Sequence, residues 1–268
     1  MELGLQNRAA LVAASTKGLG FALAQELVRE GCRVMICGRD AARLEAAVVR
    51  LRAQLPANGE AAAVAGLAVD VMDPAGVQQL VEHAVAAFGG LDIVVTNAGG
   101  PAGGTFDTTA QADWERGVQL TLMSAVRLIR AALPYLRQSD AASILAITSI
   151  SVKQPIAGLL LSNVIRPAVA GLVKALSQEL GPEGIRANAI LPGWTETERV
   201  GEILAYRAQV NGSSPAVERD KITVSIPLGR MARPEEFGRV AAFMVSPAAS
   251  YLNGVMLPVD GGSYQGLL

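Results

Sequence analysis

The sequence predicts an α/β fold in which helices cover both faces of a mainly parallel sheet of about seven strands. Short runs rich in Val, Ile, Leu and Ala alternate with longer segments of helical period along the chain. Several of these short runs are apolar at nearly every position, which is typical of strands buried on both faces of a parallel sheet. Because no repeat, charge block or linker interrupts the alternation, we expect one doubly wound domain that spans residues 1–268.

The strands and helices are expected to follow one another along the whole chain. Asp40 precedes one helical segment, and Asp73 with Pro74 at the first helical position precedes another, so both helices have recognisable N-caps. A further amphipathic helix is expected to begin at Pro167, because proline disfavours helical geometry in the residue before it. The polar stretch at about 196–230 departs from the alternation, and we expect it to cover the carboxyl edge of the sheet as a substrate lid. The expected strands are 8–14, 33–37, 64–70, 91–95, 143–148, 185–191 and 254–259.

Composition excludes several classes of partner. The chain has 268 residues, of which 51% are hydrophobic, and a formal net charge of -1. The scattered charges show no basic surplus, which argues against nucleic acid as a partner. No positive segment precedes the first apolar run, and no apolar stretch is expected to approach the roughly 18 residues of a membrane span. We therefore expect a globular cytoplasmic protein without membrane contact.

Cysteine and histidine are too few for a structural zinc site. Cys32 and Cys37 flank one expected strand at an odd separation, which directs their side chains to opposite faces and makes a disulfide difficult. Together with His83, the single histidine, they cannot supply the four ligands that such a site needs, and no metal is expected. His83 also lies on a helix expected to be exposed, which argues against a Ser-His-Asp hydrolase.

A glycine-rich loop joins the first strand to the first helix. The segment AASTKGLG occupies residues 13–20, and helical sequence begins at Phe21. Gly18 and Gly20 let the backbone approach a pyrophosphate, which is attracted by the free amides and positive dipole of the helix N-terminus. This position between strand and helix favours a dinucleotide site, and hence a Rossmann-like domain, over a simple tight turn.

The residues after the second strand favour NADP over NAD. An acidic side chain there accepts the adenine-ribose hydroxyls in sites that prefer NAD, whereas this chain has Gly38 and Arg39. Asp40 is better explained as a helix cap, and Lys17 adds a second cation from the loop. Arginine presents a planar fork of donors that suits the 2'-phosphate of NADP. The alternative is that Arg39 and Lys17 are solvated surface groups.

Four further motifs follow the glycine-rich loop. They are Asp70-Val71 after the third strand, TNAGG at 96–100, LPGWTET at 191–197 and LPVDGG at 257–262. With these motifs the chain resembles the short-chain dehydrogenase/reductase family over nearly its whole length, particularly the reductases of 3-oxoacyl carriers. The resemblance implies a small-molecule carbonyl or alcohol substrate and a homo-oligomer, either a dimer or a homotetramer. The cofactor-binding residues that the resemblance and the loop imply are Ser15, Thr16, Lys17, Gly18, Leu19, Gly20, Arg39, Asp70, Val71, Asn97, Ala98, Gly99, Arg166, Pro192, Gly193, Thr195 and Thr197.

The catalytic positions of the family are largely replaced. In the family, tyrosine protonates the substrate oxygen, lysine lowers the tyrosine pKa and binds the nicotinamide ribose, serine orients the carbonyl, and asparagine supports a water relay. The block RPAVAGL places Arg166 at the lysine position and Ser162 at the tyrosine position. Ser149 fits the serine, and Thr121 stands at the asparagine position. Only one of the four residue types is therefore retained.

These replacements remove the usual acid but not the cation. The Ser162 hydroxyl is much less acidic than a phenol and its side chain is shorter, so it does not readily protonate an alkoxide. Arg166 can bind ribose hydroxyls but cannot enter a proton relay. If the helix begins at Pro167, these two side chains need not share a face. The candidates for a replacement acid are Lys153, Tyr206, Glu196 and Glu198.

Three hypotheses remain open at this point. The first is an NADP(H)-dependent oxidoreductase with an altered proton donor, in which Ser149 holds the substrate oxygen, Arg166 binds the ribose, and Lys153 or a lid residue donates the proton. The second is a catalytically silent NADP-binding protein with a regulatory or sensor role. The third is a non-redox reaction that uses the bound cofactor as a scaffold.

Overall fold

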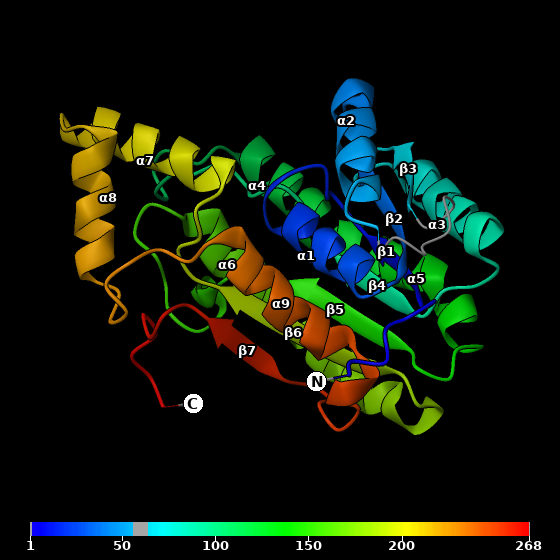
Figure 1. Cartoon of the computed structure of the whole chain (residues 1–268). Coiled ribbons are helices and arrows are strands. Elements are labelled where there is room, and N and C mark those ends of the chain that lie inside the picture. Colours follow the sequence, from blue (N-terminus) through cyan, green and yellow to red (C-terminus); the bar gives the residue numbers. More distant parts are fainter. Residues whose placement is uncertain (1, 56–63, 268) are drawn as a thin grey trace.

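Seven parallel strands form one sheet in the order β3-β2-β1-β4-β5-β6-β7 (Figure 1) in the computed structural model, which describes residues 2–55 and 64–267. The predicted α/β architecture is confirmed, while residues 1, 56–63 and 268 of the expected domain lie outside the described part of the chain. The strands are β1 (Ala9–Val12), β2 (Arg33–Gly38), β3 (Val64–Ala68), β4 (Ile93–Thr96), β5 (Ser143–Ile147), β6 (Arg186–Pro192) and β7 (Met256–Val259).

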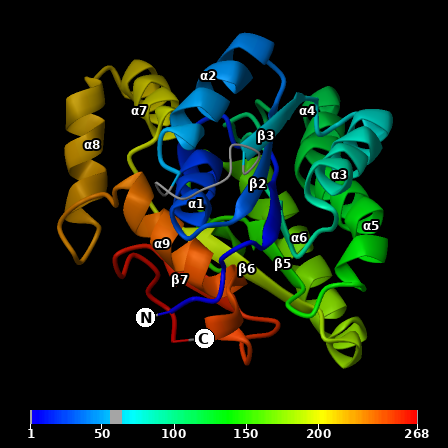
Figure 2. The ribbon, with the colours of Figure 1, turned by 45° about the vertical axis from the view of Figure 1, so that its right-hand side comes forward.

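Helices cover both faces of the sheet (Figure 2). Their bounds are α1 (Gly18–Arg29), α2 (Ala41–Arg52), α3 (Pro74–Phe88), α4 (Gln111–Gly117), α5 (Ser124–Leu136), α6 (Leu160–Glu179), α7 (Glu198–Asn211), α8 (Pro215–Val224) and α9 (Pro234–Val245), with short turns η2 (Val118–Met123), η3 (Ile150–Val152), η4 (Gly181–Glu183) and η5 (Pro247–Ala249). α1, α2 and α9 form one core with the sheet, in which Leu23, Leu51 and Phe237 are completely buried. α3, α5 and α6 form the opposite core, which contains Leu80 and Val173.

The central strands are buried on both faces, as the continuous apolar runs predict, whereas the edge strands β3 and β7 are largely half-buried. Every residue of β1, β4 and β5 is buried. Cys32 belongs to one core and Cys37 to the other, and both thiols are free. Burial raises the pKa of the Cys37 thiol to about 11, so it is protonated near neutral pH and unreactive.

The order of the strands determines where a ligand binds. From β1 the chain proceeds outward to β2 and β3, and it then returns to β4 on the other side of β1. The loops after β1 and β4 consequently diverge and leave a crevice at the carboxyl edge of the sheet. Ligands of doubly wound folds bind at such a switch point.

The expected start of the helix at Pro167 is wrong. α6 begins at Leu160, and Pro167 lies inside it. The first turn is fixed by tertiary contacts, because Asn163 Oδ1 accepts from Ile156 N at 3.0 Å and Asn163 Nδ2 donates to Ile156 O at 2.9 Å. These bonds offset the local cost of a proline within the helix. As a result, Ser162 and the arginine four residues later share one helical face.

The expectation that no stretch approaches the length of a membrane span also needs correction. Among the described residues, α6 is the one helix that is long and apolar enough to cross a membrane by length and composition. In this structure, however, it packs against the sheet, with Val169 and Val173 buried in the core. The apolar face of α6 is therefore explained by the core of the domain.

The polar stretch before the last strand forms a helical pair beside the carboxyl edge. α7 and α8 contact each other and enclose a small apolar cluster of Leu204, Ile222, Ile226 and Met231 (Figure 1). Thr197 caps α7 and Ser214 caps α8 through their side chains. The pair is thus a packed unit that can cover the crevice.

Candidate active site

The glycine-rich loop forms a strained turn at the end of β1. Ala14 has a φ of +46°, a region that non-glycine residues rarely adopt, and Gly18 has a φ of +61°. Ser15 is completely buried, and its Oγ donates to Val12 O at 2.5 Å. Lys17 at the N-cap of α1 makes no side-chain capping bond. The first amides of α1 therefore remain available to an anion.

Asn97 links this loop to the loop after β4. Its Nδ2 donates to Ala13 O at 3.1 Å and to Ala14 O at 3.0 Å. A Cβ atom on Gly20 would lie only 2.7 Å from the same Nδ2, which explains the glycine at this position. Asn97 thus holds the two sides of the switch point together.

A cavity of about 770 Å³ opens at this switch point, and it brings together many of the predicted cofactor residues. Thr16, Lys17, Arg39 and the pair Asp70-Val71 line it, as does Gly99 on the β4 side. Ser15, Gly18, Leu19 and Gly20 do not line the cavity; Ser15 and Gly20 are buried, and Leu19 packs against the adjacent core.

Three cationic side chains line this cavity. The Arg39 side chain is 68% exposed and lies 4.0 Å from an Asp70 carboxylate oxygen. Lys17 Nζ lies 3.8 Å from Glu202 Oε1 on α7. Arg43 also lines the cavity, although it was not among the predicted cofactor residues. The signal for it was its position in the first turn of the helix capped by Asp40, whose Oδ1 accepts from Arg43 N at 2.9 Å.

Ser162 and Arg166 form a hydrogen-bonded pair on α6. Arg166 Nε donates to Ser162 Oγ at 3.0 Å, and Nη1 donates to Thr148 O at 2.7 Å. Burial, together with the nearby positive charge of Arg199, lowers the pKa of the Arg166 guanidinium to about 10. The group nevertheless stays protonated near neutral pH. It fixes a positive charge next to the end of β5.

Thr121 lies in a π-helical segment, Val118–Met123, between α4 and α5. Its buried Oγ1 has no hydrogen-bond partner in the described part of the structure. Thr121 lines a small cavity together with Asn97, Ala98, Thr148 and Arg166. Such π-helical turns occur frequently at functional sites, and this one brings the asparagine and lysine positions of the family together.

Ser149 and Lys153 lie at the two ends of the short turn η3. Ser149 Oγ accepts from Ser151 N at 3.1 Å and caps the turn. Ser151 Oγ in turn lies 3.4 Å from Ser162 Oγ, which connects the turn to α6. Lys153 Nζ lies 5.2 Å from the ring centroid of Tyr264.

The other candidate acids occupy different surroundings. Tyr206 is 48% exposed on α7. Glu196 forms an ion pair with Arg219. The carboxylate of Glu198 lies near the glycine-rich loop, 3.9 Å from the position of a Cβ on Gly18. Among the four candidates, Lys153 is the one that flanks the same short turn as Ser149.

The segment after β6 contributes two threonines. Thr195 is buried, and its Oγ1 has no partner within the described residues. Thr197 Oγ1 instead accepts from Val200 N at 3.4 Å at the start of α7. Pro192 ends β6, and a Cβ on Gly193 would lie 2.7 Å from Asp260 Cα. Gly193 therefore permits the chain after β7 to pass close to β6.

The lid helix contacts the loop after β4. Arg199 Nη2 donates to Pro101 O at 2.8 Å, and Arg207 Nη2 donates to Ala157 O at 3.3 Å. Gly104 also pairs with Leu159 in a single β-bridge. These contacts tie α7 to the loops that follow β4 and β5.

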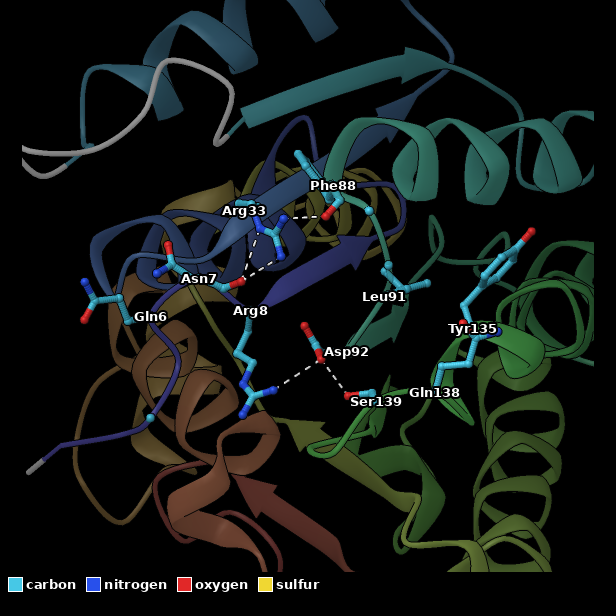
Figure 3. Close-up of a pocket in the computed structure, with 13 residues that line it drawn as sticks. Gln6, Asn7, Arg8, Arg33, Phe88, Leu91, Asp92, Tyr135, Gln138 and Ser139 are labelled. Carbon is cyan, nitrogen blue, oxygen red and sulfur yellow. Dashed lines mark hydrogen bonds and ion pairs between the residues drawn. The ribbon is translucent and has the colours of Figure 1, made fainter.

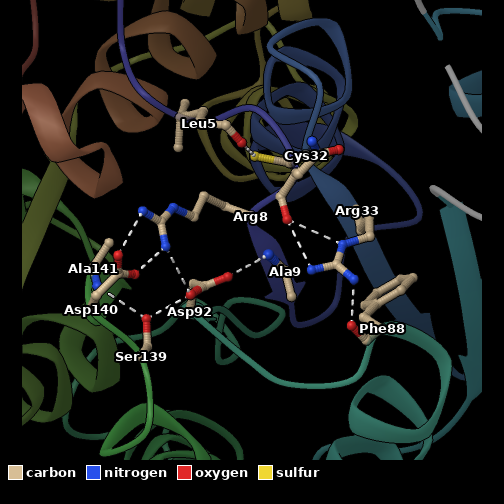
Figure 4. Close-up of polar contacts among 11 residues, drawn as sticks. Leu5, Arg8, Ala9, Cys32, Arg33, Phe88, Asp92, Ser139, Asp140 and Ala141 are labelled. Carbon is tan, nitrogen blue, oxygen red and sulfur yellow. Dashed lines mark hydrogen bonds and ion pairs between the residues drawn. The ribbon is translucent and has the colours of Figure 1, made fainter. Parts of the chain in front are cut away.

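A second cavity of about 500 Å³ lies at the amino edge of the sheet (Figure 3). Its charged groups are paired with one another or with backbone atoms (Figure 4). Asp92 Oδ2 accepts from Ala9 N at 2.7 Å, Oδ1 accepts from Ser139 Oγ at 2.6 Å, and Arg8 pairs with both Asp92 and Asp140. Arg33 donates to the carbonyls of Asn7 and Phe88. This network joins the starts of the strands and has a structural role.

Comparisons with known proteins agree with this geometry. Residues 13–264 match the family model described as enoyl-(acyl carrier protein) reductase. The human mitochondrial protein dehydrogenase/reductase SDR family member 2 is 32% identical over 97% of this chain and 87% of its own length. L-Sorbose reductase from Gluconobacter frateurii, solved with NADPH and L-sorbose, is 30% identical with a TM-score of 0.92, covering 100% of both chains. An NADPH-bound short chain oxidoreductase from Pseudomonas aeruginosa PAO1, described as containing an atypical catalytic center, is 29% identical with a TM-score of 0.87 over 97% of this chain and 98% of its own.

Proposed function

The chain belongs to the short-chain dehydrogenase/reductase family, and we propose that it is an NADP(H)-dependent oxidoreductase that acts on a small carbonyl or alcohol substrate with an altered proton donor. The observation that carries this proposal is the cavity of about 770 Å³ lined by Lys17, Arg39 and Arg43. Solved relatives that bind NADPH support the choice of cofactor. The pair Ser162–Arg166, which replaces tyrosine and lysine, supports an altered donor.

The residues present fit a dinucleotide. A Cβ on Gly38 would lie 2.6 Å from Thr16 Cγ2, so the glycine is needed for close packing of the loop. The amides at the start of α1 would hold the pyrophosphate, and Lys17, Arg39 and Arg43 would hold the 2'-phosphate. The unpartnered hydroxyl of Thr195 is available to the carboxamide. When bound, NADPH supplies the hydride for reduction.

At the catalytic end of the site, binding of the nicotinamide ribose and donation of the proton are assigned to different residues. Arg166 carries the fixed positive charge and suits the ribose hydroxyls, but a guanidinium does not release its proton near neutral pH. Ser162 Oγ already accepts from Arg166, and an aliphatic hydroxyl is a poor acid. We assign Ser149 to the substrate oxygen and Lys153 to the proton, because both lie on the same short turn.

Binding and turnover measurements test this function. Calorimetry with NADPH and NADH should show tighter binding of NADPH. NADPH oxidation should then be followed with ketones, keto esters and quinones, including ethyl acetoacetate, 2,3-butanedione and L-sorbose. Turnover with at least one class is expected, and it should decrease in Ser149→Ala. If neither nucleotide binds, the proposal fails.

A catalytically silent sensor remains the second candidate, because the hydroxyl of Ser162 is occupied by Arg166 and no tyrosine stands at that position. This candidate predicts tight NADPH binding, no turnover across the panel, and an affinity that Ser149→Ala leaves unchanged. The same two measurements therefore distinguish an enzyme from a sensor.

A further inference from the structure

The chain after β7 (Figure 1) contacts the end of β6 and the segment that follows η3. It first passes Gly193 at the end of β6, where the Cα of Asp260 leaves no room for a Cβ. It then reaches the turn that carries the predicted acid, where Gln265 N donates to Gln154 Oε1 at 3.4 Å. The C-terminal segment thus joins the side of the sheet on which Ser149 lies.

Asp260 fixes the conformation of this segment. Its Oδ1 accepts from Gly262 N at 2.9 Å, and its Oδ2 accepts from Tyr264 N at 2.7 Å. Ser263 Oγ donates to Asp260 O at 2.7 Å. These local bonds form a compact turn, and they hold the backbone of Tyr264 in one position beside η3.

The aromatic ring of Tyr264 meets the side chain of Lys153. Lys153 N donates to Ile150 O at 2.9 Å, which ends the turn that begins at Ser149. Its Nζ lies 5.2 Å from the ring centroid, within the range of a cation–π contact. Lys153 and Tyr264 are both partly buried. The ring therefore restricts the rotamers of an otherwise flexible ammonium group.

We propose that Lys153 is the catalytic acid and that Tyr264 is the positioning residue that holds its ammonium group beside the substrate oxygen. This inference rests on the proposed function. During reduction the carbonyl carbon accepts a hydride, the π-electron pair moves to the oxygen, and a proton passes from Lys153 Nζ to that oxygen. The products are the alcohol, NADP+ and a neutral amine, which solvent protonates again. Tyr264 acts through the face of its ring and donates no proton.

The contact can be measured without any substrate. The chain has four lysines, so reductive methylation with 13C-formaldehyde gives a small set of side-chain signals in NMR spectra. The signal of Lys153, identified by its loss in Lys153→Arg, should lie upfield because the tyrosine ring shields groups above its face. Tyr264→Phe should keep this shift and Tyr264→Leu should remove it. Tyr251→Leu, which changes a fully exposed tyrosine, is the matched control. A Lys153 signal that is unshifted in the unmutated protein would overturn the proposal.

Kinetics test the proton transfer itself. Lys153→Met should lower kcat for a carbonyl substrate by about a hundredfold or more, the range of general acid catalysis. Lys153→Arg should lower kcat to a similar extent, because arginine keeps the positive charge but does not release a proton. Lys174→Met, on the outer part of α6, is the control for lysine removal.

The tyrosine series separates positioning from acid catalysis. Tyr264→Leu should lower kcat by roughly tenfold, and Tyr264→Phe should recover most of that loss because it keeps the ring. Equal losses in both variants would make the phenol the acid and overturn the assignment. Full activity in Lys153→Arg would also overturn it. If NADPH binds and carbonyls are reduced in Lys153→Met, the assignment of Lys153 as the acid fails while the proposed NADP(H)-dependent oxidoreductase activity stands; if NADPH does not bind, the proposed function fails.

Discussion

Replacement of Arg39 by glutamine should reduce the affinity for NADPH and leave that for NADH nearly unchanged. Arg39 lines the nucleotide cavity, and its nearest anionic partner is Asp70 at 4.0 Å. The 2'-phosphate is the only group that distinguishes NADPH from NADH. Loss of the guanidinium therefore weakens the binding of NADPH but not that of NADH. It also leaves the Asp70 carboxylate without its cationic neighbour, so this carboxylate repels the 2'-phosphate.

The expected loss in NADPH affinity can be worked out from the solvent exposure of the Arg39 side chain. Two unit charges about 4 Å apart attract by about 1 kcal/mol in water and about 4 kcal/mol at an effective dielectric constant of about 20. Because the Arg39 side chain is 68% exposed, the value near that of water applies. A phosphate carries more than one negative charge, so we expect a loss of about 1–2 kcal/mol, which is a roughly 5- to 30-fold increase in Kd.

Calorimetry with both nucleotides at low and high salt measures this effect. The loss for NADPH should shrink at high salt because exposed charges are screened. Arg130→Gln, an exposed arginine on α5 that does not line the cavity, is the matched control. An equal loss of NADPH and NADH affinity, or no loss of either, would refute the assignment of Arg39 to the phosphate.

Three further substitutions test the loop and the surface. Gly20→Ala should destabilise the protein by about 1–3 kcal/mol in urea unfolding, because its Cβ would lie 2.7 Å from Asn97 Nδ2; unchanged stability would contradict the close contact. Ala14→Gly should stabilise it by about 0.5–1 kcal/mol in the same assay, since it relieves a φ of +46°; a loss of stability would argue against strain there. Arg230 lowers the pKa of Glu236 to about 2, so the carboxylate contributes stability above its usual pKa of 4.5 that is lost as the pH falls through about 2. Glu236→Gln should therefore lower Tm at neutral pH, and this difference should disappear between pH 4.5 and about 2; a constant difference across that range would refute the ion pair.

The strand pattern of the fold could be predicted because buried parallel strands leave continuous apolar runs in the sequence. Helix caps such as Asp73 could also be predicted from the sequence, because a carboxylate before the first turn accepts from the local amides Ala75 N and Gly76 N. The start of α6 was not predictable from local preference. Pro167 favours a helix start, but the bonds between Asn163 and Ile156 extend the helix by two turns, and such contacts depend on the folded loop.

The residues of the candidate site likewise fall into those that the sequence could locate and those that only the folded structure brings together. Lys17 and Arg39 could be located because each follows a strand of the switch point, so sequence order fixes their edge of the sheet. Tyr264 could not be located, since its contact with Lys153 joins segments more than a hundred residues apart. The π-helical turn at Thr121 was equally hidden, because no residue pattern distinguishes it from an ordinary helix.

Ser162 and Arg166, which the sequence resemblance places at the tyrosine and lysine positions, are physically coupled. Arginine is longer than lysine and serine is shorter than tyrosine, so Nε reaches the hydroxyl at 3.0 Å while Nη1 reaches Thr148 O at 2.7 Å. This arrangement keeps a positive charge near the end of β5 on a group that does not release its proton near neutral pH. In the family, one tyrosine-lysine pair serves both cofactor binding and proton donation. If Arg166 binds the ribose and Lys153 donates the proton, Arg166→Ala should raise the Kd for NADPH, whereas Lys153→Met should lower turnover and leave that Kd unchanged.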